Sequence, residues 1–345
     1  MSVAVAFDRV SIVFGDAPET ALPLMDEGRD RGEIGRETGQ ILGVHDCSLE
    51  VGEGEIVVLM GLSGSGKSTL LRAVNGLAPV TRGGVRVRAA EGMIDVTGAN
   101  AATLRRLRLG TVAMVFQQFA LLPWRTVAEN VGLGLEIGGV AKAERAERVA
   151  RQLALVGLAD WGGRQVAELS GGMQQRVGLA RAFATEAPIL LMDEPFSALD
   201  PLIRGKLQGE LLELQRELRR TIVFVSHDLD EAFRIGDRIA IMEGGRIVQS
   251  GAPAEIFSAP ATPYVADFVA HMNPLGVLRA RDVAGPLDGP ASDAAVPAAA
   301  PVAEAMRAAV SVEGAVRVTG DDGGTVGWIT RGAILARLLD PRGGA

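Results

Sequence analysis

The sequence predicts an α/β protein built on a largely parallel β-sheet, and three observations support this fold class. Up to about Phe268, segments with strand character alternate with helical segments and short glycine-rich turns, which is typical of a parallel sheet covered by helices. Several expected strands are continuous apolar runs, as burial on both faces requires. The hydrophobic content of 48% with only 4% aromatic residues indicates a core of Val, Leu, Ile and Ala.

Composition and charge narrow the class of function. The 345 residues are enough for one large or two modest domains. The net charge of −7 argues against a nucleic-acid-binding protein. We see no apolar run near the roughly 20 residues that a membrane-spanning helix needs, and no basic segment of a secretory signal at the N-terminus. The single cysteine, Cys47, fits a reducing cytoplasm.

A glycine-rich loop follows the first buried strand, Ile56–Met60. Residues 61–69 read GLSGSGKST and lead into a helical pattern, which is the strand–loop–helix context of a phosphate-binding loop (P-loop). Its glycines allow backbone N–H groups to surround an anion, and the helix N-terminus adds positive potential. Lys67 is expected to pair with the β- and γ-phosphates of ATP, and the Ser68 hydroxyl to ligate Mg²⁺. The expected ATP-binding residues of this loop are Gly61, Ser63, Gly64, Ser65, Gly66, Lys67, Ser68 and Thr69.

Two acidic residues end a second buried run, residues 189–192. Carboxylates at the C-terminal end of such a strand lie where open α/β sheets bind ligands. We therefore expect Asp193 to hold Mg²⁺ through water and Glu194 to polarise the attacking water. The alternative, two solvated acids in a turn, is weakened by the four apolar residues before them.

A third buried strand begins at Thr221 and leads to His227. A lone histidine is more often structural than functional. At the same sheet edge as Glu194, however, His227 is a candidate sensor of the γ-phosphate.

Residues 169–176, LSGGMQQR, closely resemble the signature motif of ATP-binding cassette (ABC) ATPases. A serine and two glycines at a helix start form a second anion site. The resemblance implies that this site closes over the γ-phosphate held by the P-loop of a second copy, giving a head-to-tail dimer around two ATP molecules. The residues involved would be Ser170, Gly171, Gly172 and Gln174.

Further matches follow in the order of that family. Gln117 matches the glutamine that contacts Mg²⁺ and links to the membrane subunit, and His227 matches the switch histidine. Asp200, in the sequence SALD, matches the loop that communicates between the two ATP sites. The resemblance covers about residues 1–270 and implies a P-loop NTPase (RecA-like) core with a mixed sheet and a helical signature subdomain at about 118–185.

The family places an aromatic residue against adenine, and here the matching Phe14 lies unusually far upstream of the P-loop. A core phenylalanine at a strand end is the alternative. The intervening insertion, about residues 16–40, together with residues 197–204 and 224–241, resembles the glycine betaine, proline and choline importer branch. Residues 271–275 and the short tail resemble choline importers most, so choline is the expected cargo, with glycine betaine or proline as the alternative.

The C-terminal region is expected to be separate from the ATPase domain of residues 1–270. Residues 271–302, Pro- and Ala-rich after about Gly285, are predicted to be a flexible linker. Residues 303–345 are predicted to form a small α+β unit that resembles half of a cystathionine-β-synthase-type (CBS) domain. It would contain strands Ala315–Thr319 and Thr325–Ile329 and a helix capped by Thr330 and ending before Pro341. Such a unit is too small to stand alone and should pack on its dimer counterpart.

The family resemblance also implies partners. The apolar connector of residues 119–124 is expected to accept helices of an integral membrane permease, although it could instead pack within the helical subdomain. An extracytoplasmic substrate-binding protein is an indirect partner, and nucleic acid is not expected. The chain is thus predicted to be a quaternary-amine-transporting ATPase on the cytoplasmic side of a bacterial inner membrane. A soluble translation or repair ATPase and an exporter component are the remaining alternatives.

Overall fold

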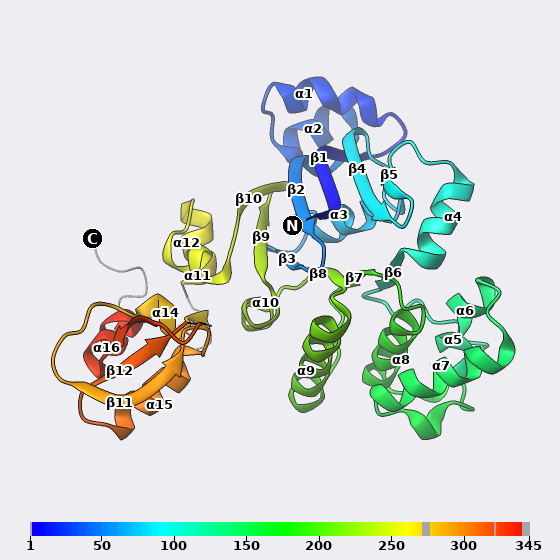
Figure 1. The fold of residues 1–345 in the computed structure, drawn as a ribbon. Coiled ribbons are helices and arrows are strands. Elements are labelled where there is room, and N and C mark those ends of the chain that lie inside the picture. The colour runs from blue at the N-terminus through cyan, green and yellow to red at the C-terminus, as the bar shows by residue number, and fades with distance from the viewer. Residues whose placement is uncertain (1, 271–276, 321, 340–345) are drawn as a thin grey trace. The chain divides into compact units, whose positions relative to one another are not determined.

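The computed structural model describes residues 2–270, 277–320 and 322–339, without the side chains of Leu214 and Leu339. Its contacts divide the chain into two units (Figure 1). Unit 1 contains Met1–His227 and Met242–Ile247, and unit 2 contains Asp228–Ile241 and Val248–Ala345. No helix in the described ranges has the length and apolar character needed to cross a membrane.

The first sheet of unit 1 is antiparallel, with strand order β2-β1-β4-β5. β1 and β2 are long, and Phe14 at the end of β1 pairs with Ile41 at the start of β2. This pairing places Phe14 where the two strands end, and the residue is 39% exposed. The strands are β1 (Val3–Phe14), β2 (Ile41–Gly52), β4 (Arg82–Ala89) and β5 (Gly92–Asp95).

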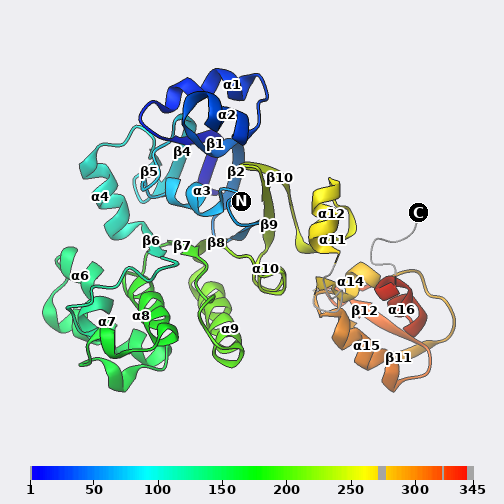
Figure 2. The same cartoon turned by 180° about the vertical axis from the view of Figure 1, so that it is seen from behind.

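The expected insertion between Phe14 and Ile41 is folded. It contains the 3₁₀ helix η1 (Pro18–Ala21), α1 (Leu22–Asp26) and α2 (Arg31–Thr38). Met25 and Ile34 from these helices pack with residues of β1 and β2 in a small core, and both views show α1 and α2 beside that end of the sheet (Figures 1 and 2). Burial of apolar side chains therefore holds the insertion in place.

The second sheet of unit 1 contains four parallel strands in the order β3-β8-β7-β6. These strands are β3 (Ile56–Met60), β8 (Thr221–Val225), β7 (Ile189–Asp193) and β6 (Val112–Val115). Every residue in them is buried, which explains their continuous apolar sequence. The P-loop, the acidic pair and His227 all follow strands of this sheet, so their side chains meet at one edge.

The helices of unit 1 fall into two groups. Between β6 and β7, a compact set packs around α8 (Figure 1), and this set is the predicted helical signature subdomain. It contains α5 (Val127–Val131), α6 (Leu133–Ile137), α7 (Lys142–Leu155), η2 (Ala159–Trp161), η3 (Val166–Glu168) and α8 (Gly171–Ala184). The others are α3 (Lys67–Ala73), α4 (Ala101–Gly110) and α9 (Pro201–Leu218). The predicted α/β class, with mixed strand directions and a helical subdomain, is confirmed.

Unit 2 begins with short elements and ends in a small α+β region. Its first elements are α10 (Leu229–Ile235), β9 (Arg238–Glu243), β10 (Arg246–Gly251), α11 (Pro253–Ser258) and α12 (Pro263–Val269), with the last residues of β9 and the first of β10 assigned to unit 1. The C-terminal elements are α14 (Ala280–Val283), β11 (Ala291–Pro297), α15 (Val302–Ser311), β12 (Ala315–Thr319), β13 (Thr325–Ile329) and α16 (Arg331–Leu339). Strand β12 is central in the three-stranded sheet, parallel to β11 and antiparallel to β13.

The prediction of a flexible linker over residues 271–302 is wrong for the part that the structure describes, which begins at residue 277. Residues 280–283 form α14, Leu278 and Ala280 are buried, and Gly285 pairs with Trp328. Residues 291–297 form β11, whose backbone pairs with β12 and whose Val296 is buried opposite Val318. Pairing with a strand about 20 residues later compensates for the weak strand character of the segment. The two predicted strands, Ala315–Thr319 and Thr325–Ile329, are present as β12 and β13, and the predicted helix is present as α16. The Thr330 hydroxyl accepts a hydrogen bond from the Ala333 N–H.

Some predictions fall outside the described residues. The segment 271–275, which suggested a choline importer, and Pro341 both lie there. The domain boundaries and the resemblance of the tail to half of a CBS domain remain predictions.

Candidate active site

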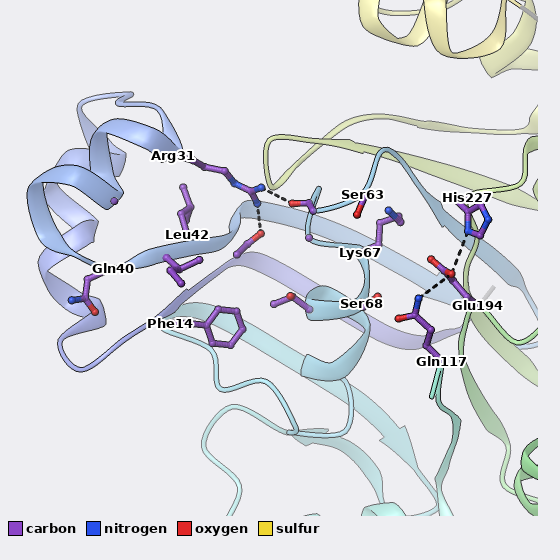
Figure 3. A pocket seen from close by; sticks show the side chains of 16 residues that line it. Phe14, Arg31, Gln40, Leu42, Ser63, Lys67, Ser68, Gln117, Glu194 and His227 are labelled. Atoms are coloured by element: carbon purple, nitrogen blue, oxygen red, sulfur yellow. Dashed lines mark hydrogen bonds and ion pairs between the residues drawn. The ribbon is translucent and has the colours of Figure 1, made fainter. Parts of the chain in front are cut away.

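A cavity of about 740 Å³ lies in unit 1, beside the P-loop and the strand ends that follow it (Figure 3). Its size falls within the roughly 300–1,000 Å³ common for small-molecule sites. Phe14 and Gln40 lie at one end, and Glu194 and His227 lie at the other. The wall is formed by Phe14, Arg31, Gly35, Gln40, Ile41, Leu42, Gly43, Ser63, Gly64, Gly66, Lys67, Ser68, Thr69, Gln117, Glu194 and His227.

The P-loop depends on glycine at two positions. Gly61 and Gly66 have φ angles of +141° and +101°, which side chains rarely tolerate. A Cβ at Gly61 would lie 2.1 Å from the Met242 carbonyl oxygen, and a Cβ at Gly66 would lie 2.5 Å from the Gly43 carbonyl oxygen. The loop thus combines positive φ with close backbone packing.

Lys67 is buried at the start of α3. Its Nζ donates hydrogen bonds to the Gly61 and Leu62 carbonyls at 2.8 and 2.9 Å. Burial lowers the pKa of Lys67, while Glu194 and Asp193 act in the opposite direction. The ammonium therefore lies beside the loop that would receive a phosphate chain, with the carboxylates at the end of β7 nearby.

Asp193 is the fully buried end of β7. Its Oδ1 accepts a hydrogen bond from the Ser68 hydroxyl at 2.6 Å, and its Oδ2 lies 2.9 Å from an Arg72 guanidinium nitrogen. Hydroxyl and carboxylate oxygens are ligands of the kind that Mg²⁺ prefers. Ser68 and Asp193, which the sequence predicts as metal ligands, are thus adjacent.

Glu194 is the meeting point of three chain segments. Its Oε2 accepts a hydrogen bond from Gln117 Nε2 at 3.1 Å and lies 3.2 Å from His227 Nδ1 (Figure 3). Its backbone has a φ of +49°, a strained value for a residue with a side chain, and such strain often occurs at functional sites. The structure therefore brings together the three predicted catalytic residues Gln117, Glu194 and His227.

The predicted signature residues lie outside the wall of this cavity. Ser170 caps α8 by accepting the Met173 N–H at 3.4 Å. Gln174 donates to the Val166 and Leu169 carbonyls. Asp200 caps α9 through the Ile203 N–H at 3.0 Å. Gly171 and Gly172 form the first turn of α8. In a single copy these residues have local structural roles. Their predicted contact with ATP would require a second copy of the chain.

The apolar connector, residues 119–124, is partly held by the helical subdomain. Arg181 of α8 donates to the Phe119 and Ala120 carbonyls, and the Asn130 side chain bonds both backbone groups of Leu122. Trp124 at its end is 71% exposed. Hydrogen bonds to the helical subdomain thus hold the connector, while the Trp124 side chain stays exposed.

Sequence reasoning missed Gln175. This buried amide donates to the Glu194 carbonyl at 3.2 Å and accepts the Ala198 N–H at 3.1 Å. It therefore ties the helix of the signature motif to the backbone of Glu194. Its place within the signature motif was the only available signal, because burial of a polar side chain cannot be read from the motif. Arg72, the partner of Asp193, was also missed, because its partner lies 121 residues away in the sequence.

Comparison with known proteins agrees with this geometry. A family model described as ABC transporter matches residues 44–197. The chain is 48% identical over 284 residues to the glycine betaine/proline betaine transport system ATP-binding protein ProV of Salmonella typhimurium, covering 82% of this chain and 70% of that protein. It is 48% identical over 276 residues to the glycine betaine/carnitine transport ATP-binding protein GbuA of Listeria monocytogenes, covering 80% and 68%.

A solved structure has the same fold. The dimeric ATP-binding cassette MJ0796, in a post-hydrolysis state bound to ADP and Pi, superposes with a TM-score of 0.62 and 31% identity. The match covers 72% of this chain and 98% of that one. From the site geometry and these similarities, the chain belongs to the ABC transporter family and is one of its ATP-binding, ATP-hydrolysing subunits.

Proposed function

We propose that this chain powers the uptake of a betaine-type quaternary amine through a separate membrane permease. The observation that carries the proposal is the 48% identity over 284 residues to ProV, which extends well beyond the 44–197 family match. Other relatives are named for glycine betaine with carnitine and for trimethylamine N-oxide. These cargoes share a fully substituted, methylated nitrogen.

Glycine betaine is the first cargo to test, and choline the second. Choline carries the same trimethylammonium group, but the relatives described here are named for betaines, carnitine and trimethylamine N-oxide. We infer that an extracytoplasmic binding protein and the permease select among these amines, while this chain supplies the energy.

Glu194 is the proposed general base for hydrolysis. Gln117 and His227 both approach its Oε2 and would fix the carboxylate for the attacking water. Lys67 and the P-loop backbone would hold the phosphate chain. Ser68, Asp193 and Gln117 would hold Mg²⁺, which when bound would neutralise phosphate charge. Phe14, at the opposite end of the cavity, would stack on adenine.

The working form is proposed to be a head-to-tail dimer. Ser170 and Gly172 lie outside the cavity of their own chain, and a cap at a helix start is suited to binding an anion. A second copy would bring these residues to the γ-phosphate. The dimeric MJ0796 structure is a precedent for two cassettes binding nucleotide together. ATP would stabilise this closed dimer, and hydrolysis would release it.

We propose that the permease docks at the apolar connector of residues 119–124, with the exposed Trp124 as a contact residue. Helices of the permease would thereby sense the state of Gln117, which lies two residues before the connector. The chain would then be peripheral to the cytoplasmic face of the membrane. The tail, if it is CBS-like as its sequence suggests, would regulate this cycle.

Reconstitution tests the function directly. The complete complex, with permease and binding protein in vesicles, should hydrolyse ATP faster when glycine betaine is added outside. The arms of the assay are glycine betaine, carnitine, proline and choline, each with and without binding protein. Stimulation by choline alone would reassign the cargo. A rate that responds to none of the amines would contradict the proposal.

A further inference from the structure

Arg31, at the start of α2, lies on the wall of the ATP cavity. We propose that it is a further nucleotide-binding residue, supplied by the insertion, whose counter-ion is the phosphate chain of the nucleotide. This inference rests on the assignment of the cavity as the ATP site.

The guanidinium of Arg31 contacts the P-loop directly (Figure 3). One terminal nitrogen donates to the Gly64 carbonyl at 2.6 Å, and the other donates to the Gly43 carbonyl of β2. The insertion thereby bridges the P-loop and the strand beside it. A planar guanidinium with several donors is suited to bridging acceptors in this way and to binding phosphate.

The charge of Arg31 lacks a carboxylate partner within the described part of the chain. Both hydrogen bonds go to neutral carbonyls, and its buried Nε has no hydrogen-bond partner. Burial lowers the pKa of Arg31, and no carboxylate offsets this effect. Arg29, two residues earlier, differs because it is exposed and paired with Glu27, Glu33 and Glu37.

A half-buried cation normally has a counter-charge. The guanidinium of Arg31 shares its cavity wall with Gly64, Lys67 and Ser68 of the P-loop. A phosphate chain held by that loop would bring negative charge close to Arg31. The nucleotide is therefore the ligand that would complete the charge balance of this wall.

The position of Arg31 is fixed before any ligand binds. Asp30 and Glu33 form a capping box at the start of α2, and Ile34 is buried in the core of the insertion. Gly245 leaves room for the guanidinium, because a Cβ there would lie 2.7 Å from its terminal nitrogen. Folding has thus already ordered the Arg31 side chain, so nucleotide binding would cost little further side-chain entropy.

The test is a calorimetric titration of the full-length chain with ADP, which avoids hydrolysis. We expect Arg31→Met to raise the Kd for ADP about tenfold, equivalent to about 1.4 kcal/mol. Arg31→Lys keeps the charge but cannot donate to the Gly64 and Gly43 carbonyls together, so it should raise the Kd for ADP about threefold. The control is Arg36→Met, which removes one positive charge from the exposed side of the same helix and should leave the Kd unchanged.

An unchanged Kd in Arg31→Met would overturn the proposal. If that variant does not fold, amide hydrogen exchange in the wild-type chain still decides, because ADP should slow exchange over residues 31–38 and an unaffected rate would refute the contact. Lys67→Ala separates the two assignments: if it binds ADP like the wild type, the ATP site itself is misplaced. If Lys67→Ala loses affinity and Arg31→Met does not, only the role of Arg31 fails.

Discussion

The Nδ1 atom of His227 lies 3.2 Å from Oε2 of Glu194, across the ends of the adjacent strands β8 and β7. Gln117 reaches the same oxygen from the segment after β6. The carboxylate is thus restrained from two sides at the edge of one parallel sheet. This restraint gives the proposed general base a defined direction.

Glu194→Gln should abolish hydrolysis while preserving ATP binding. The amide has nearly the same shape but cannot take a proton from water, so we expect the turnover rate to fall by about 10²–10⁴-fold. Phosphate release measures the rate, and size-exclusion chromatography with ATP should show a stable dimer. Near-normal turnover in this variant would remove Glu194 from its role.

His227→Ala should lower kcat more than it changes KM. The loss of one restraint on Glu194 leaves nucleotide contacts intact but spoils the orientation of the base, for an expected decrease in kcat of roughly tenfold to a hundredfold. Steady-state ATPase kinetics separate the two constants. A rise in KM with unchanged kcat would show that His227 serves binding instead.

Lys67→Ala should weaken binding of ATP itself. Charged hydrogen bonds contribute roughly 1.5–3 kcal/mol each, so the Kd should rise at least about tenfold. Lys206→Ala is the matched control, because this lysine has a 64% exposed side chain and pairs only with Glu210 among the described ion pairs. Equal ATP affinities of the two variants would count against the P-loop assignment.

The ATP-binding core could be predicted because its signals are local. The P-loop sequence and the acidic pair each follow a run of buried residues, and the parallel sheet brings the ends of those runs together. The same continuous apolar runs also identified these segments as buried strands. The role of Ser170 toward ATP cannot be decided from one copy, since it depends on a second chain.

Non-local features escaped prediction for a physical reason. β11 contains mainly Ala, Ser, Asp and Pro, which have little strand propensity, and only its pairing with β12 makes it a strand. Arg31 and Gln175 each contact residues far away in the sequence. Their chain neighbours give no sign of these partners, so the three-dimensional arrangement was needed to find them.

The pairing of β11 with β12 in the C-terminal sheet gives a stability prediction. Val296→Asp should destabilise the C-terminal sheet by on the order of 2–5 kcal/mol, because it buries a charge between β11 and its neighbours. Ala295→Asp, at an exposed position of the same strand, should have little effect. Hydrogen exchange over residues 315–329 reads out the sheet. Equal behaviour of the two variants would restore the linker interpretation.

Cys47 gives a pH-dependent prediction. Burial raises the pKa of its thiol from 9.0 to about 11, and its Sγ lies 3.2 Å from the Gly245 carbonyl oxygen. The pKa of the Cys47 thiol is higher in the folded chain than in the unfolded chain. The buried neutral thiol therefore contributes its full stabilisation below pH 9, and this stabilisation is lost as the pH rises from 9 towards 11. At about 1.36 kcal/mol per pKa unit, the loss is at most roughly 3 kcal/mol.

Cys47→Ala should therefore lose less stability than the wild type between pH 9 and pH 11. Urea unfolding of both proteins at several pH values measures this difference, since other groups titrate alike in the two chains. The native thiol should also resist maleimide at pH 8 and react once the chain is unfolded, because the thiolate is the reactive form. Rapid labelling of the native protein, or parallel pH profiles of the two chains, would show that the thiol is not held protonated by burial.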